Sequence, residues 1–560
     1  MNDFLDLAMN LAMDGRTLTN LRTCDRNFDR ICLMRNIFAL RRVNDKFVIP
    51  NPSKNDKKSE NFRLLGNKLF SVEKWFGALE YYNKSICFAT KNSEQLAIGY
   101  ANRSAVYLEL KEYKLCLDNI SLARAAALPG RLMNKLNQRE ADCLRLMETD
   151  GNGNQNNSQL GKEELQLSRT AHSQVPFIVD CLEMKRNLEH GRHIVTNEDL
   201  KPGEIIAIED AFVCGLDESF NYRRCTYCTK ENVLSLISCD VCTNTMFCSD
   251  CVNDAKEDFH KIECPISAFL AAFENTRFVL RLVLRALKSF TSAEDLIGVM
   301  KESPEHTVFS FDQAETLNAK EKYLPVHSLV TNDDKQSDID ELFRAMYSTI
   351  LCEKLICNTS LKEIWPIDTD FGAKMVLADV INHCFEIVPQ NGHKLTSYGD
   401  NKETEEFGGA IYPFASLLNH ACSPNVFRVT HGTKLILMVL RNIKKGEQLL
   451  DCYAKRYSSK TVTQKERRES IKQTLHFDCR CIACVNNFPL RTCYKCGNIP
   501  AVSIVVDDIK QQTVNCSQYL EKYDSKYPCV EVDAAQEVLI GCMNDLYGNK
   551  SAKCNFKTMD

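Results

Sequence analysis

The sequence predicts an α+β protein of several domains, with helices in its first part and short strands after residue 177. Three observations lead to this prediction. A helical pattern repeats within residues 58–148, cysteines cluster at 225–264 and 479–496, and β-prone runs flank a long helical stretch. With 560 residues the chain is too long for one hydrophobic core, so two to four domains are expected.

Composition excludes some classes of function. The chain is 44% hydrophobic and 26% charged, with a net charge of −4, which argues against a general nucleic-acid binder. No apolar run approaches the roughly 20 residues that span a bilayer. The first 14 residues carry three aspartates and lack a basic n-region and a long apolar stretch, so we expect no secretory signal and no membrane partner.

The N-terminal part is predicted to be helical. Residues 1–57 form an amphipathic helical segment that ends in a polar linker with Pro50 and Pro52. Within residues 58–148, Gly66, Ala78, Tyr82 and Ser85 align with Ser104, Cys116, Ile120 and Ala123, each pair 38 positions apart (for example 104 − 66). Small residues at helix crossings in such a repeat are typical of tetratricopeptide (TPR) units, against the alternative of unrelated helical hairpins.

The remaining boundaries follow from composition. A Gly/Asn-rich linker is predicted at 149–174, and β-prone runs at 175–224. A helical stretch follows the first cysteine cluster at 265–385, and short strands return at 386–456. The second cysteine region covers 457–500, and a helical tail covers 501–560.

The first cysteine cluster predicts two structural zinc ions. In a chain without a secretory signal, paired cysteines indicate metal ligands rather than disulfides. Eight ligands fall within 40 residues: Cys225, Cys228, Cys239, Cys242, Cys248, Cys251, His260 and Cys264. A segment so short has little hydrophobic core, so the metal ions are expected to hold it together.

This spacing resembles a MYND zinc finger, in which the ligand pairs interleave. The resemblance implies that Cys225, Cys228, Cys248 and Cys251 hold one ion and that Cys239, Cys242, His260 and Cys264 hold the other. The third pair departs from the usual spacing, because Cys251 stands one residue earlier than the family pattern, which would use position 252. We therefore expect a shifted helix start there.

A second motif lies near the middle of the C-terminal half. Asn419-His420-Ala421-Cys422-Ser423-Pro424-Asn425 is followed by Lys444-Lys445-Gly446-Glu447 and then by Asp451-Cys452-Tyr453. These segments, in this order, resemble the knotted core of SET-domain methyltransferases, and Gly191-Arg192-His193 resembles its opening strand. With the zinc finger inserted between those parts, residues 177–484 resemble the SET-and-MYND family of protein-lysine methyltransferases, in the subgroup with N-terminal TPR repeats.

The resemblance implies a set of site residues and cofactors. S-adenosylmethionine would contact Arg192, His193, His383, Asn419, His420, Tyr453 and Phe477. Tyr453 would act as the catalytic residue, with its hydroxyl near the reacting methyl group. Cys422, Cys479, Cys481 and Cys484 would bind a third zinc ion in a post-SET segment. Cys493 and Cys496 form another pair whose partners the sequence does not identify.

Three departures from the family pattern leave an alternative open. His383 stands where an asparagine is usual, Leu475 replaces an aromatic wall of the lysine channel, and Ala421 replaces a serine. The first hypothesis is a protein-lysine methyltransferase, and the second is a catalytically weak or inactive adaptor that keeps the SET fold.

The repeat carries a second constellation. Arg63, Asn67, Asn102, Lys135 and Arg139 fall where chaperone-binding TPR proteins carry a carboxylate clamp. The resemblance therefore implies an acidic C-terminal peptide of the Hsp90 or Hsp70 type as partner, besides the substrate lysine and a corepressor or proline-rich partner at the zinc finger. We expect a cytoplasmic and nuclear protein.

Overall fold

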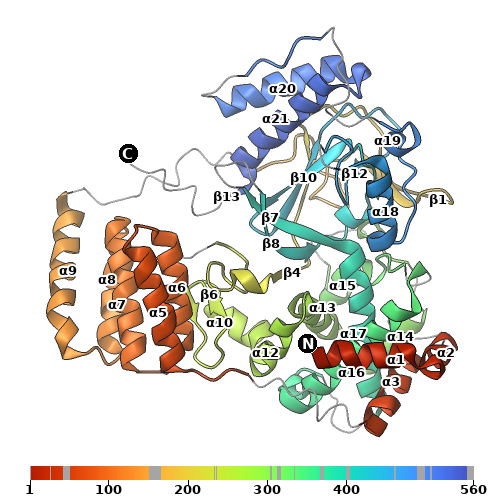
Figure 1. The fold of residues 1–560 in the computed structure, drawn as a ribbon. Helices are drawn as coiled ribbons and strands as arrows, with labels where there is room; N and C mark the ends of the chain where they lie inside the picture. Colours follow the sequence, from red (N-terminus) through yellow and green to blue (C-terminus); the bar gives the residue numbers. More distant parts are fainter. Residues whose placement is uncertain are drawn as a thin grey trace.

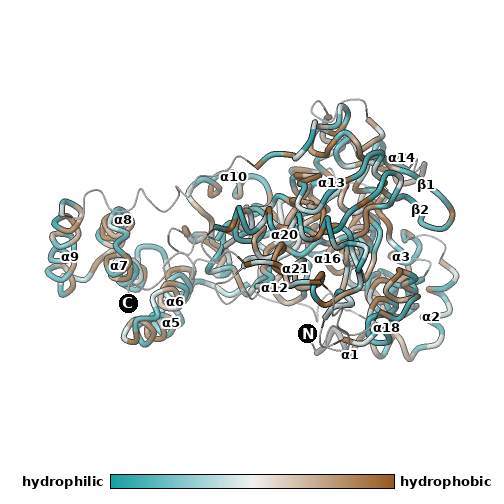
Figure 2. Tube along the Cα trace, turned by 90° about the horizontal axis from the view of Figure 1, so that it is seen from above, coloured by the Kyte–Doolittle hydropathy of each residue, from teal (hydrophilic) through white to brown (hydrophobic). Residues whose placement is uncertain are grey.

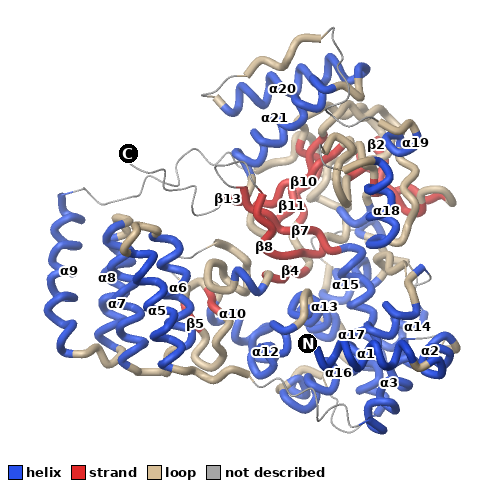
Figure 3. Tube along the Cα trace, in the orientation of Figure 1, coloured by secondary structure: helices blue, strands red, loops and turns tan. Residues whose placement is uncertain are grey.

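The computed structural model describes residues 2–24, 27–41, 51–149, 165–231, 234, 236–302, 305–311, 317–332, 335–365, 371–398, 404–459, 462–488, 499–504 and 508–550. Figure 1 shows a stack of helices at one end and a larger mixed body at the other. Figure 3 shows that most strands gather in that body, between a helical layer and the last two helices. Within these described ranges, no helix is long and apolar enough to cross a membrane.

The β-rich part is assembled from strands that lie far apart in the sequence. They are β1 (Leu182–Asn187), β2 (Gly191–Thr196), β3 (Ile205–Glu209), β4 (Val213–Leu216), β7 (Gly392–Tyr398), β8 (Thr404–Ile411), β9 (Asn419–His420), β10 (Val426–His431), β11 (Lys434–Val439), β12 (Leu450–Asp451) and β13 (Asn549–Lys550). Strand β3 pairs with β11, and β4 pairs with β8. The segment between β4 and β7 is therefore an insertion into one β-rich domain.

The insertion begins with the cysteine cluster and continues as helices. Its elements are β5 (Ile237–Ser238), β6 (Met246–Phe247), α10 (Val252–Ala255), α11 (Lys261–Glu263), α12 (Ser267–Ala272), α13 (Thr276–Lys288), α14 (Ala293–Glu302), α15 (Ala319–His327), α16 (Asp338–Asn358) and α17 (Phe371–Asn391). Helix α13 is buried along most of its length, and its buried residues include Arg277 and Arg281. Helix α17 continues past residue 385 and leads directly into β7.

Three helices open the chain and complete the core of this insertion. They are α1 (Asn2–Met13), α2 (Gly15–Arg22) and α3 (Asn27–Arg41). Leu21, Ile31 and Met34 are buried in one cluster with residues of α16 and α17. Arg30 also forms an ion pair of 3.0 Å with Glu341. The predicted N-terminal helical segment thus packs against residues more than 300 positions later.

The repeat region forms antiparallel helices, α5 (Asp56–Phe70), α6 (Trp75–Phe88), α7 (Glu94–Glu109), α8 (Tyr113–Ala125) and α9 (Gly130–Thr149). A Cβ atom on Gly66 would lie 2.5 Å from the Tyr82 ring, so this crossing requires glycine. The turns between paired helices repeat too: Glu73 (φ 57°) and Lys111 (φ 58°) share a left-handed conformation and stand 38 residues apart (111 − 73). In Figure 2, α9 stands at the outer end of the stack.

The last elements cover the β-rich part. They are α18 (Gln464–Leu475), α19 (Ile482–Val485), α20 (Ile509–Tyr523) and α21 (Val530–Tyr547). Leu520 and Leu539 pack with Val429 and Ile436, so the pair α20–α21 covers the outer face of β10 and β11. The predicted helical tail is therefore an integral layer of the SET-like part.

Candidate active site and metal centres

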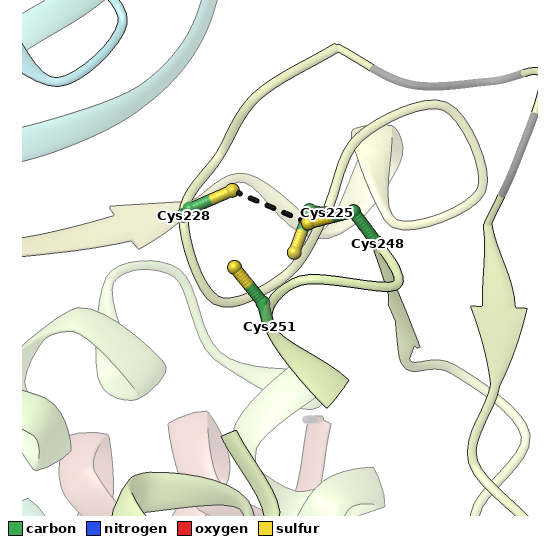
Figure 4. Close-up of side chains that lie close together, drawn as sticks. All are labelled: Cys225, Cys228, Cys248 and Cys251. Carbon is green, nitrogen blue, oxygen red and sulfur yellow. Dashed lines mark hydrogen bonds between the residues drawn. The ribbon is translucent and has the colours of Figure 1, made fainter. Parts of the chain in front are cut away.

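The first cysteine set converges on one point (Figure 4). The Sγ atoms of Cys225, Cys228, Cys248 and Cys251 all lie within 4.8 Å of one another. Four thiolates in this arrangement suit a closed tetrahedral zinc site. Cys251 is the residue directly before α10, so the early cysteine becomes a ligand from the start of that helix.

The second set combines three cysteines with a histidine. Cys239, Cys242, His260 and Cys264 also offer ligand atoms within 4.8 Å of one another. His260 ends a π-helical turn (Lys256–His260), and its Nε2 lies 3.7 Å from the Cys242 Sγ. The donor set fits a structural zinc ion and leaves no open position for chemistry.

A buried carboxylate supports this second centre. Glu263 is 0% exposed, and its Oε2 lies 4.0 Å from the His260 Nδ1. Its oxygens also pair with Arg277 at 3.0 Å and Arg281 at 2.6 Å, both buried on α13. Burial would raise the pKa of Glu263, but the charges of Arg281 and Arg277 hold that pKa well below its ordinary value. The ligand His260 is therefore tied to the helical insertion through one carboxylate.

We predict that Glu263→Gln destabilises the protein strongly. Without the carboxylate, two buried guanidinium groups lose a counter-charge, which typically costs about 3–5 kcal/mol in the free energy of unfolding. Chemical denaturation in the presence of zinc measures this loss. The control is Glu406→Gln, which removes an exposed ion pair with Lys394 and should cost less than about 1 kcal/mol. Equal effects of the two substitutions would contradict the prediction.

The repeat stack is docked onto the cysteine segment by polar contacts that the sequence did not suggest. The Lys54 Nζ donates to the Cys239 carbonyl at 2.6 Å. The buried Arg103 donates to the Leu236 carbonyl at 2.9 Å and to the Asn83 side chain at 2.9 Å. The stack and the metal segment therefore form a continuous body.

The third set joins the Asn-His motif to the post-SET segment. Cys422, Cys479, Cys481 and Cys484 offer sulfur atoms within 4.8 Å of one another. The Cys422 Sγ lies 3.6 Å from that of Cys484. Four thiols again fit a structural zinc ion, so the described part of the chain holds three such sets. Cys493 and Cys496 lie outside the described residues.

The Asn-His motif lies in a parallel pairing of two short strands. Asn419 is opposite Leu450 in the β9–β12 ladder. Its Nδ2 donates to the Gln448 side chain and to the His190 carbonyl, each at 2.9 Å. Asn425 fixes the crossing, because its Oδ1 accepts the Leu450 amide at 2.7 Å. Segments about 30 residues apart thus cross at one point.

Tyr453 follows β12 and is held at both ends. Its backbone amide donates to the His420 Nδ1 at 2.9 Å, and its hydroxyl donates to the Leu418 carbonyl. The His420 and Tyr453 ring centres lie 5.2 Å apart, and the His420 and Phe477 centres 5.9 Å. Tyr453 is 37% exposed, and desolvation of its partly buried hydroxyl moves the pKa of that group further above neutral pH.

His420 has a structural task besides any contact with a cofactor. Its Nε2 lies 3.4 Å from the Cys422 Sγ of the third metal set, while its Nδ1 accepts from Tyr453. Burial lowers its pKa to about 4. The imidazole therefore connects Tyr453 with the post-SET metal ligands.

Arg192 and His383 meet a common turn of the insertion. The Arg192 Nη2 donates to the Ser328 carbonyl at 2.6 Å, and the His383 Nε2 lies 3.1 Å from the His327 carbonyl. His383 also lies 3.3 Å from the Glu386 carboxylate. Burial opposes protonation, but the hydrogen bond and charge of Glu386 outweigh it and raise the pKa of His383.

The remaining predicted residue of the opening strand, His193, directly follows Arg192 in the sequence. It is buried, and its Nδ1 lies 3.0 Å from the Gly191 carbonyl. The residues predicted to bind the cofactor thus fall into two groups: Asn419, His420, Tyr453 and Phe477 around the crossing, and Arg192 with His383 at residues 327–328. The β1–β2 hairpin joins them, because His190 contacts Asn419 and precedes Arg192 by two residues.

Sequence reasoning missed several buried polar residues near this site. Glu209 on β3 accepts the backbone amides of Phe414 and Ala415 at 2.7 and 3.0 Å. Asn27 of α3 donates to Glu386 at 2.8 Å and so reaches the partner of His383 from the N-terminal helices. No local spacing marks such residues, because their partners lie about 200 or more positions away.

In the repeat stack, the predicted clamp asparagines meet. The Asn102 Nδ2 donates to the Asn67 Oδ1 at 2.8 Å, and the Tyr82 hydroxyl donates to the same oxygen at 2.9 Å. Burial raises the pKa of Tyr82 to about 12, against the lowering effect of the nearby Arg63 and Arg139 charges. Four of the five predicted residues therefore surround Tyr82.

The cations differ in their surroundings. Arg139 donates to the Ser104 hydroxyl at 2.9 Å, and burial lowers its pKa. Arg63 pairs with Glu60 at 3.2 Å. Lys135, one turn before Arg139 on α9, is exposed.

Comparison with known proteins identifies the type of domain that contains these residues. The SET domain family model matches residues 191–454. "Protein-lysine N-methyltransferase SMYD4" of Pongo abelii is 26% identical over 544 residues, covering 76% of this chain and 66% of the relative. The Danio rerio protein of the same name is 24% identical over 543 residues, covering 82% and 70%. The chain thus spans about two thirds of the length of these relatives.

Two further matches are more limited. "Histone-lysine N-methyltransferase SMYD3" of Mus musculus is 40% identical over 84 residues, which is 15% of this chain and 19% of that protein. A solved structure titled "Crystal structure of the SET domain of LSMT bound to Lysine and AdoHcy" covers 62% of this chain and 61% of that one, with a TM-score of 0.25 and 12% identity, too distant to add to the argument. Together, the SET match and the long SMYD4 alignments show that this chain carries a SET domain and is similar to SMYD4 proteins over most of its length.

Proposed function

We propose that the protein is an S-adenosylmethionine-dependent protein-lysine N-methyltransferase. The observation that carries the proposal is the crossing of β9 and β12, which brings Asn419, His420 and Tyr453 together beside Phe477. Methyl transfer to a neutral amine needs alignment and a dry site more than a nucleophilic side chain. A tyrosine hydroxyl fixed at both ends and aromatic rings around it suit that need.

The residues present fit the cofactor. The Nη1 of Arg192 is buried and has no hydrogen-bond partner in the described part of the chain, so it can receive a carboxylate. Asn419 and Arg192 would hold the polar groups, and the ring of Phe477 would pack on the cofactor, where an aromatic face favours a sulfonium charge. When bound, S-adenosylmethionine supplies an activated methyl group.

One observation favours the second candidate, an adaptor with a SET fold and little catalysis. Both nitrogens of His383 are engaged, one with the His327 carbonyl and one with Glu386. In this position the imidazole does not offer the free amide of the usual asparagine. Leu475 likewise supplies no aromatic wall beside Phe477.

Incubation with methyl-labelled S-adenosylmethionine and an array of intact proteins separates the two candidates. The enzyme proposal expects label in methyl-lysine after hydrolysis of the modified proteins. Cofactor binding without label on any protein of the array would favour the adaptor.

We also propose that the helical stack is a TPR module that binds acidic C-terminal peptides of the Hsp90 or Hsp70 type. Asn67 and Asn102 lie together, and Arg63 and Arg139 flank the same Tyr82. Amides and guanidinium groups suit a terminal carboxylate and acidic side chains. The exposed Lys135 would supply a further cation at the edge.

We predict that Lys135→Ala weakens the binding of a peptide ending in Glu-Glu-Val-Asp. The loss in binding free energy should be roughly 1–3 kcal/mol, which raises the Kd about 5- to 150-fold. Fluorescence anisotropy with the full chain measures the affinity. The control is Lys114→Ala, an exposed lysine on α8, which should leave the affinity unchanged. A chain that binds the amidated peptide equally well would contradict the clamp.

The interleaved cysteine segment is proposed as a MYND finger that acts as a scaffold. Its two closed donor sets leave protein contact as its function, with a corepressor or proline-rich segment as partner. For the whole protein we propose a cytoplasmic and nuclear location.

A further inference from the structure

The Arg428 side chain on β10 joins three elements behind Tyr453. Its Nε lies 2.9 Å from the Asp451 Oδ2, and its Nη2 donates to the Cys452 carbonyl at 3.2 Å. Its Nη1 lies 2.5 Å from the Nδ1 of His393 on β7. One guanidinium thus holds the two residues directly before Tyr453 and connects them with another strand.

His393 links Arg428 to Ser416 through its two ring nitrogens. A guanidinium can only donate, so the His393 Nδ1 is the acceptor and its Nε2 carries the proton. That Nε2 lies 3.2 Å from the Ser416 hydroxyl. Burial and the charge of Arg428 hold the pKa of His393 well below its ordinary value, which keeps the imidazole neutral.

Ser416 belongs to the turn that receives the Tyr453 hydroxyl. This turn (Ala415–Leu417) precedes Leu418, whose carbonyl accepts that hydroxyl. Glu209, 3% exposed, fixes the start of the turn by accepting the amides of Phe414, which precedes the turn, and of Ala415, its first residue. Burial raises the pKa of Glu209 to about 8.

A continuous, partly buried path therefore connects the backbone before Tyr453 with the carbonyl that holds its hydroxyl. We propose that Arg428, acting through His393 and the turn fixed by Glu209, is a positioning residue that sets the place of the Tyr453 hydroxyl. This inference rests on the proposed methyltransferase function for its catalytic meaning. A misplacement of about 1 Å in a catalytic group costs on the order of 100-fold in rate.

The test compares Arg428→Met and Arg428→Lys with a matched control, Thr430→Val. Thr430 is two residues further on the same face of β10, is buried, and also bonds β7, at the Thr396 carbonyl (2.9 Å). Turnover in Arg428→Met should fall about 10- to 100-fold, with KM and cofactor Kd within about threefold of wild type. Turnover should fall less in Arg428→Lys than in Arg428→Met, and it should stay at the wild-type level in Thr430→Val.

Amide hydrogen exchange of residues 451–454 gives a readout that needs no activity. Both Arg428 variants should exchange faster there than wild type and Thr430→Val. If the wild-type protein proves inactive, the proposed function fails. Amide hydrogen exchange of residues 451–454 then decides by itself whether Arg428 positions this segment. Unchanged exchange in folded Arg428→Lys, or faster exchange with unchanged turnover in an active enzyme, would overturn the positioning role.

Discussion

Tyr453→Phe should reduce methyl transfer by about 100-fold or more while S-adenosylmethionine binds with nearly wild-type affinity. The substitution removes only the hydroxyl, which the Leu418 carbonyl holds in place beside His420. An interaction made mainly in the transition state lowers turnover when it is lost and leaves ground-state binding intact. Single-turnover kinetics together with calorimetric titration of the cofactor measure both quantities on the same preparation.

His420→Ala is the informative companion. From the family pattern alone, its loss should weaken cofactor binding first. The structure adds that its imidazole accepts from the Tyr453 amide and lies beside Cys422. We therefore expect His420→Ala to lower both affinity and turnover. An enzyme in which Tyr453→Phe keeps full turnover would show that the active site lies elsewhere.

Removal of zinc should have the other large effect. Elemental analysis should give three zinc ions per chain, one for each donor set. Apparent binding free energies of structural zinc are about 10–16 kcal/mol at neutral pH, so chelation should unfold the segment 225–264. It should also abolish any methyl transfer, because the third set fixes Cys422 two residues from His420. One zinc ion or none would contradict the assignment.

Cysteine variants show which zinc ion is bound by which of the three donor sets. Cys484→Ser should remove one zinc ion and activity, and Cys248→Ser should remove one ion and leave the third set filled. Cys516→Ser is the control, because Cys516 is buried on α20 outside all three sets. Its protein should keep three ions.

The metal sets could be predicted from sequence because their information is local. Pairs such as Cys225 and Cys228 stand three positions apart in a turn, so spacing alone brings their sulfurs together. The pairing between sets came from family resemblance, and the structure brings the same residues together. The repeat could also be predicted from the sequence, because its offset of 38 residues is a local pattern. The same offset recurs in the left-handed turns at Glu73 and Lys111.

Long-range polar contacts could not be predicted in this way. Arg428 and His393 are separated by 35 positions, and Glu209 lies 205 positions before Phe414. Nothing in their neighbouring residues distinguishes them from surface charges, which is the usual place for such residues. The docking of α3 on α17 through Asn27 and Glu386 is hidden for the same reason. These contacts arise from the packing of whole elements.

Calorimetric titration of the intact, zinc-loaded protein with S-adenosylmethionine tests the central claim most directly. The account predicts saturable binding at one site per chain, weakened by Asn419→Ala, whose side chain bonds Gln448 and the His190 carbonyl at the crossing. Wild-type protein that carries three zinc ions yet shows no binding of S-adenosylmethionine would contradict the methyltransferase account.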